Sequence, residues 1–284
     1  MKPILIENLA QIWDNYDAIL SDVWGVIHNG ARQYAPATKA LQAFRASGRP
    51  IVLISNSPRP SPQIPPQLAR LDICETTYDK IVTSGDATIM AARQFGKKAF
   101  RLGPSKDDDF FAGIGVEYVE IEDAEFIVCT GPRDDLTETA ESYRDELKAM
   151  AAYKLPFICA NPDKVVQMGD RLIFCGGSLA DIYAEYGGEV MMAGKPFAPI
   201  YEMCFEELQK INGTPIDKSR ILCIGDGPIT DVLGANNQGL DCLFVAGGIH
   251  GEELLGVNGL DEAKTETFMK DHGLNAKYAI YELE

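Results

Sequence analysis

Three polar residues that could carry chemistry stand at or just after the ends of apolar runs. They are Asp22, Ser55 and Asp226. A carboxylate can act as a nucleophile or as a ligand of a hard cation, and a hydroxyl can donate a hydrogen bond to an anion. Each residue also has an ordinary alternative interpretation, since Asp and Ser are common in turns and helix caps. Taken singly, none of the three predicts a reaction.

Three further polar residues stand close to these points. Asn56 directly follows Ser55, Lys195 lies in a Gly-Lys-Pro sequence, and Asp231 follows a threonine before a helical pattern. Alone, these indicate a turn amide, a surface lysine and a helix N-cap. The six residues fall in four short stretches of the sequence, at 22–25, 55–56, 195–196 and 225–231. Four such stretches in this order favour one shared site, because their chance combination is much rarer than any one of them.

The elements that must position these residues are short apolar runs alternating with helical patterns. The expected strands of the flanking regions are 17–21, 50–54, 80–83, 220–224 and 241–245. The expected helices are 36–48, 85–95, 197–211, 231–238 and about 261–271. This alternation predicts an α/β fold with a parallel sheet, in which strand ends converge on one edge. Asp22, Asp226 and Asp231 would then form an oxygen-rich site suited to Mg²⁺, and Ser55 with Lys195 would hold a phosphate.

The middle of the chain has a different texture, with denser charge and shorter elements. We expect an inserted domain at 97–190, between a first core segment at 1–96 and a second at 191–284. Within the insertion, a hairpin is expected to turn at Gly169–Asp170. The charged stretches 106–109 and 117–125 are expected to be a solvated face. We find no internal repeat.

Composition limits the function classes. The 284 residues are 46% hydrophobic and 24% charged, with a net charge of −16, which is typical of a globular protein with an ample core. So acidic a surface repels nucleic acid and anionic membranes, so neither is an expected partner. Seven cysteines without a C-x-x-C pair, most of them in apolar runs, indicate buried thiols in a reducing, cytoplasmic location. No signal peptide or membrane-spanning run is expected.

The four stretches together resemble the haloacid dehalogenase superfamily of aspartate-nucleophile phosphohydrolases. Asp22-Val-Trp-Gly looks like its first motif, Ser55-Asn56 the second, Lys195 in Gly-Lys-Pro the third, and Gly225-Asp226 with Thr230-Asp231 the fourth. The position of the insertion, with 161–163 and 176–177 inside it, resembles the subclass with a large α/β cap. The resemblance implies a Rossmann-like parallel-sheet core, an inserted cap and a homodimer formed through the cap.

The same resemblance implies a mechanism. Asp22 would attack phosphorus and form an aspartyl-phosphate. Mg²⁺ would be held by Asp22, the backbone carbonyl of Trp24 and Asp226, with Asp231 ligating or acting from outside the ligand shell. Ser55 and Lys195 would stabilise the transferring phosphoryl group. Asn56, which follows Ser55 in the core, and Gly177, in the cap, are further expected contacts of a small phosphorylated metabolite.

Trp24 departs from the family pattern, which has a second Asp two residues after the nucleophile. That Asp serves as general acid and base, whereas an indole cannot exchange a proton near neutral pH. A role for Trp24 as a gate or a stacking surface and a role for His28 as proton donor are both open, as is a simple turn role for His28. Beside a phosphatase, the sequence therefore leaves open a phospho-ligand-binding protein and a phosphoryl transferase.

Overall fold

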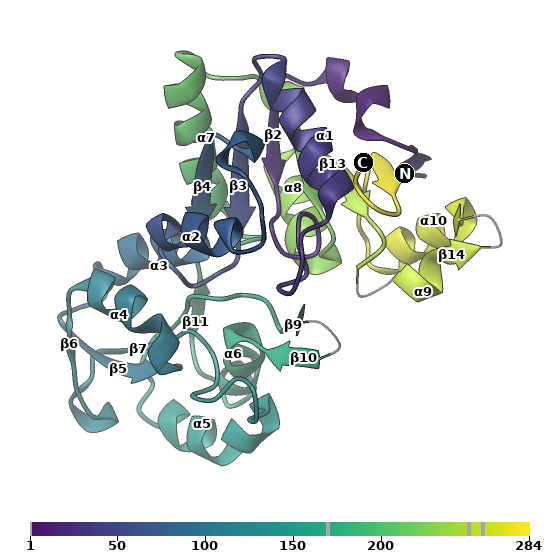
Figure 1. Cartoon of the computed structure of the whole chain (residues 1–284). Coiled ribbons are helices and arrows are strands. Elements are labelled where there is room, and N and C mark those ends of the chain that lie inside the picture. Colours follow the sequence, from purple (N-terminus) through teal and green to yellow (C-terminus); the bar gives the residue numbers. More distant parts are fainter. Residues whose placement is uncertain (1, 169–170, 249–250, 257–258) are drawn as a thin grey trace. The chain divides into compact units, whose positions relative to one another are not determined.

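The computed structural model describes residues 2–168, 171–248, 251–256 and 259–284. The chain forms two compact units, shown in Figure 1. The first comprises residues 1–55, 65–82 and 195–284, and the second comprises residues 56–64 and 83–194. None of the helices in the described parts of the chain combines the length and apolar character needed to cross a membrane.

The first unit is built on a seven-stranded sheet with the order β1-β16-β13-β12-β2-β3-β4. Its strands are β1 Ile4–Leu5, β2 Ala18–Ser21, β3 Ile51–Ser55, β4 Lys80–Thr83, β12 Ile221–Gly225, β13 Asp241–Val245 and β16 Tyr278–Ile280. The pairs from β1 through to β3 are parallel, with Ser21 in register with Ile224 on one side and Leu53 on the other. Every residue of β2, β3 and β12 is buried, as expected for strands covered on both faces.

Helices and short strands complete the first unit. They are α1 Ala35–Ala46, α2 Ile64–Ala69, α7 Ala198–Asn212, α8 Leu233–Gln238, α9 Gly251–Leu254, α10 Glu262–Asp271, β14 Leu255–Gly256 and β15 Gly259–Leu260. Proline occupies the first turn of α1 and of α7, where its missing N–H costs nothing. Glycines with positive φ follow α7 and α8 at Gly213 and Gly239, and these end the helices. The predicted α/β fold with a parallel sheet is confirmed.

The second unit has its own five-stranded parallel sheet, in the order β11-β8-β7-β5-β6. Its elements are α3 Ser84–Ala92, β5 Lys98–Leu102, α4 Asp108–Ile114, β6 Glu117–Tyr118, β7 Phe126–Cys129, α5 Arg144–Ala151, β8 Phe157–Cys159, α6 Gly176–Glu185 and β11 Val190–Met192. A separate antiparallel pair, β9 Val165–Met168 and β10 Arg171–Phe174, forms the expected hairpin. The expected turn at Gly169–Asp170 lies outside the described residues.

Two details of this unit differ from the sequence expectations. Residues 56–64, 83–96 and 191–194, expected in the two core segments, fold with the second unit. In the longest of these segments, Ala92 of α3 is buried in the same apolar cluster as Phe110 and Phe126. Within the charged stretch 106–109, Asp107 is only 3% exposed, although its neighbours face solvent. The solvated-face interpretation was therefore wrong for Asp107. Periodicity shows that a helix has an apolar face but not which sheet that face covers.

The loop after β2 carries the atypical tryptophan and a buried histidine. The His28 ring lies 5.1 Å from the Trp24 ring, centroid to centroid, in an edge-to-face arrangement. His28 is 1% exposed, and its Nδ1 accepts a hydrogen bond of 2.9 Å from the Gly30 N–H. A Cβ at Gly30, which has a φ of +81°, would come within 2.4 Å of the indole. These are the contacts of a histidine that shapes a turn around the Trp24 indole.

Burial of His28 predicts a pH dependence of stability. Burial lowers the pKa of His28 from 6.5 to about 4, so below pH 6.5 the unfolded chain binds a proton that the native chain does not. Stability is full above pH 6.5 and falls as pH drops toward 4. Between pH 7 and pH 5, wild type should lose about 2 kcal/mol more unfolding free energy than His28→Gln, measured in urea. The exposed-histidine variant His272→Gln is the control, and an equal pH response of wild type and His28→Gln contradicts the prediction.

Candidate active site

The carboxyl ends of three neighbouring strands gather the predicted residues of the first unit. β2 lies between β3 and β12, so the loop that begins at Asp22 has Ser55 beside it on one side and Gly225 and Asp226 on the other. Chain connections leave the sheet in opposite directions at such a point, and open α/β sheets bind their ligands there. The expected convergence of these strand ends on one edge is confirmed.

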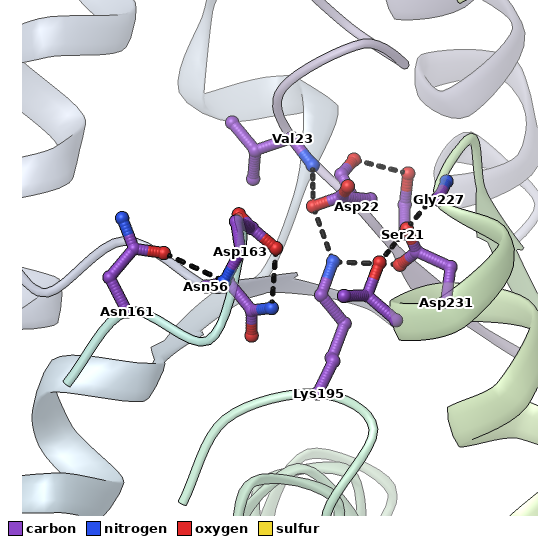
Figure 2. A network of polar contacts seen from close by, with 10 residues as sticks. Ser21, Asp22, Val23, Asn56, Asn161, Asp163, Lys195, Gly227 and Asp231 are labelled. Atoms are coloured by element: carbon purple, nitrogen blue, oxygen red, sulfur yellow. Dashed lines mark hydrogen bonds and ion pairs between the residues drawn. The ribbon is translucent and has the colours of Figure 1, made fainter. Parts of the chain in front are cut away.

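The Asp22 carboxylate is held in a fixed position at this edge. Its Oδ1 accepts hydrogen bonds of 2.7 Å from the Val23 N–H and 2.7 Å from the Lys195 ammonium, as Figure 2 shows. The Ser21 hydroxyl donates to the Asp22 carbonyl oxygen at 2.9 Å, which fixes the backbone. Asp22 is 8% exposed, so the carboxylate is largely removed from bulk water.

Lys195 is the electrostatic centre of the site. It is 1% exposed, and its Nζ lies 2.7 Å from Asp22 Oδ1 and 2.7 Å from Asp231 Oδ1. The sequence alternative of a surface-turn lysine is therefore wrong. An ammonium so deeply buried needs close anionic partners, and the two carboxylates supply them.

Asp231 is oriented by its own loop as well as by the lysine. It is 4% exposed, and its Oδ2 accepts a hydrogen bond of 3.0 Å from the Gly227 N–H (Figure 2). Both of its carboxylate oxygens therefore already have a donor. This arrangement favours a role for Asp231 in holding Lys195.

Asp226 reaches the site because two glycines leave room for it. A Cβ on Gly25, which has a φ of +83°, would lie 2.0 Å from Asp226 Oδ2, and a Cβ on Gly248 would lie 2.5 Å from the same atom. The glycine after Trp24 is thus required by a close approach as well as by the turn. Sequence reasoning missed the contribution of Gly248, although a glycine pair just after a buried strand is a signal for such an approach.

The three carboxylates are close enough to share one cation. One oxygen each of Asp22, Asp226 and Asp231 lies within 4.8 Å of the others. Burial, then the charge of Asp231 and, to a smaller extent, that of Asp226 raise the pKa of Asp22 well above its ordinary value, while Lys195 opposes the rise. One ammonium among three ionised carboxylates leaves the group with a net negative charge. A small divalent cation with a preference for oxygen fits this donor set.

Two of the predicted site residues belong to the second unit. The Asn56 side-chain amide donates a 2.8 Å hydrogen bond to Asp163 Oδ1, and Gly177 donates its N–H to the Asp163 carbonyl oxygen at 3.1 Å. Gly177 lies in the first turn of α6. Trp24, half-buried, and Ser55, 8% exposed, lie in the first unit with the carboxylates.

Two family models match the segments that carry these residues. A family model described as haloacid dehalogenase-like hydrolase matches residues 19–117, which include Asp22 and Ser55. A second model, of HAD-hydrolase-like proteins, matches residues 192–268, which include Lys195, Asp226 and Asp231.

Similar chains extend the match over nearly the whole sequence. The crystal structure of a hydrolase of the haloacid dehalogenase-like family from Brucella suis 1330 is 44% identical, with a TM-score of 0.88 over 98% of this chain and 100% of that one. The 5'-nucleotidase YutF of Bacillus subtilis (strain 168) is 25% identical over 82% of this chain and 88% of its own. Phosphoglycolate phosphatase 2 of Arabidopsis thaliana is 26% identical over 90% and 91%. The chain belongs to the haloacid dehalogenase-like hydrolase family.

Proposed function

We propose that this protein is a Mg²⁺-dependent phosphomonoesterase that acts on a small phosphorylated metabolite through an aspartyl-phosphate on Asp22. The observation that carries the proposal is the buried Lys195 ammonium between Asp22 and Asp231, with Asp226 completing a group of three carboxylates. The names of its relatives support the class of reaction, because they include a 5'-nucleotidase, a phosphoglycolate phosphatase and an acid sugar phosphatase.

The metal would be held by Asp22, Asp226 and the backbone carbonyl of Trp24. Asp231 would act mainly through Lys195, because both of its oxygens already accept hydrogen bonds. When bound, the cation supplies positive charge against the phosphoryl oxygens and keeps Asp22 ionised. It also offsets the repulsion that a chain of net charge −16 exerts on an anionic substrate.

In the reaction, an oxygen of Asp22 forms a bond to phosphorus while the bond from phosphorus to the leaving-group oxygen breaks. Water then attacks the phosphorus, the bond from phosphorus to the Asp22 oxygen breaks and a proton of the water passes to solvent, so that phosphate leaves and the carboxylate is regenerated. Lys195 and Ser55 would donate hydrogen bonds to the phosphoryl oxygens as charge develops on them, which is the main contribution a protein makes to such transfers. The second unit would act as the cap that excludes water and selects the leaving group.

Trp24 sets the rate expected of this site. Its indole packs against Gly30 and His28, and the pKa of His28, lowered to about 4 by burial, leaves that ring neutral at pH 7. Neither side chain replaces the missing carboxylic acid. Loss of a general acid and base costs about 10²–10⁴ in rate, so we expect slow turnover and a preference for leaving groups that need no proton.

The tryptophan at position 24, in place of a carboxylic acid, favours a second candidate function. A site that binds phosphate but lacks a base for water suits a phospho-ligand-binding protein, or a transferase that passes the phosphoryl group to another acceptor. In either case, we expect small phosphorylated ligands rather than nucleic acid or membranes as partners of so acidic a chain. A cytoplasmic location and a homodimer through the cap remain predictions.

Removal of the nucleophile or of the metal should abolish activity. Wild type with Mg²⁺ should release nitrophenolate from nitrophenyl phosphate, whose leaving group needs no acid. Asp22→Asn, or addition of EDTA, should lower the rate by at least about 10³-fold, because the covalent route or the cation is lost. The exposed Asp14→Asn is the matched control. Full activity in Asp22→Asn would sink the proposal.

Restoring a carboxylic acid at position 24 should raise the rate. Trp24→Asp should hydrolyse alkyl phosphates about 10²-fold faster than Trp24→Asn, which has the same size and loses the same indole packing but cannot carry a proton. Steady-state phosphate release measures both variants. Equal rates in the two variants would show that the site does not use an acid at this position and would favour the binding function.

A further inference from the structure

A buried side-chain amide, that of Asn56, lies at the start of the second unit. Asn56 is 3% exposed and directly follows Ser55. Its Nδ2 donates a 2.8 Å hydrogen bond to Asp163 Oδ1, as Figure 2 shows. Its Oδ1 lies where a Cβ on Gly194 would come within 2.6 Å, and Gly194 directly precedes Lys195. Asn56 is therefore bonded to Ser55 and packs closely against Gly194, the residue before Lys195.

The partner of this amide is held rigidly by its own loop. The Asp163 N–H donates to Asn161 Oδ1 at 3.3 Å, and the Asp163 carbonyl oxygen accepts from the Gly177 N–H at 3.1 Å. A Cβ on Gly177 would lie 2.1 Å from the Pro162 carbonyl oxygen, so the loop packs directly on the first turn of α6. Asp163 thus offers Asn56 an acceptor whose position is set by the second unit.

The packing on the other side of Asn56 is equally close. A Cβ on Gly194 would lie 2.5 Å from Ser84 Oγ as well as 2.6 Å from Asn56 Oδ1. Ser84 is fully buried, and within the described residues its hydroxyl has no hydrogen-bond partner. The chain enters or leaves the second unit at residues 56, 64, 83 and 194. The amide therefore lies at the junction of three of these chain passages.

We infer that Asn56 and Asp163 are positioning residues for the proposed phosphatase reaction: their hydrogen bond fixes the backbone that presents Ser55 and Lys195 to the phosphoryl group. The inference rests on the proposed function. Asp163 itself would not contact substrate. The loop 161–163 would affect phosphate affinity through Asn56, which is bonded to Ser55, and through Gly194, which is bonded to Lys195. Movement of this loop would shift Asn56 and, with it, Ser55 and Lys195.

Removal of the acceptor should weaken phosphate binding. Asp163→Ala should raise the dissociation constant of inorganic phosphate, measured by calorimetry with Mg²⁺ present, about tenfold, which corresponds to one hydrogen bond. The KM for nitrophenyl phosphate should rise by the same factor. Asp163→Asn, which keeps an acceptor oxygen, should stay within about threefold of wild type. In an Asn56→Ala background, Asp163→Ala should have no further effect.

A matched control separates positioning from stability. Gln63 donates a side-chain amide hydrogen bond of 2.7 Å to Asp109 in the same unit, so Asp109→Ala removes a bond of the same kind at an exposed place. Equal phosphate affinity in Asp163→Ala and Asp109→Ala, or additive effects of Asn56→Ala and Asp163→Ala, overturns the inference. Wild type that binds phosphate without turnover contradicts the proposed function alone. Wild type that binds no phosphate contradicts both.

Discussion

The rest of the site depends on one buried cation, the Lys195 ammonium held 2.7 Å from an oxygen of Asp22 and 2.7 Å from an oxygen of Asp231. Without it, three carboxylates with oxygens within 4.8 Å of one another would repel, and burial would favour their protonated forms. With it, the group keeps a net negative charge that attracts a divalent cation. Lys195 is thus a structural requirement of this edge, in addition to its proposed contact with phosphate.

Much of this arrangement could be predicted from the sequence, because strand-end positions in a parallel sheet are determined by topology. The buried runs that became β2, β3 and β12 are continuous and β-branched, so their type and order were readable. Once those strands are neighbours, Asp22, Ser55 and Asp226 must share an edge. Lys195 and Asp231 were expected at the same edge because their sequences stand close to strand ends, and the structure adds the geometry that links them.

Other features depend on packing between segments far apart in the sequence and were not readable. The pattern of α3 resembles that of any helix after a strand, yet its buried face contacts Phe110 and Phe126 in the second unit. The charged stretch 106–109 gave no sign that Asp107 alone is buried. Asn56 was expected to face substrate, whereas its amide nitrogen binds Asp163, a residue 107 positions away. A hydrogen bond between residues so far apart in the sequence produces no repeating pattern from which it could be predicted.

Phosphorylation of Asp22 can be detected by acid-quench trapping followed by peptide mass spectrometry. Since Trp24 supplies no base for the attacking water, the aspartyl-phosphate should accumulate after mixing with nitrophenyl phosphate and Mg²⁺. We expect a phosphoryl group on the peptide containing Asp22, formed in step with the first turnover and absent from Asp22→Asn. Release of phosphate over several turnovers with no phosphorylated Asp22 at any quench time would contradict it.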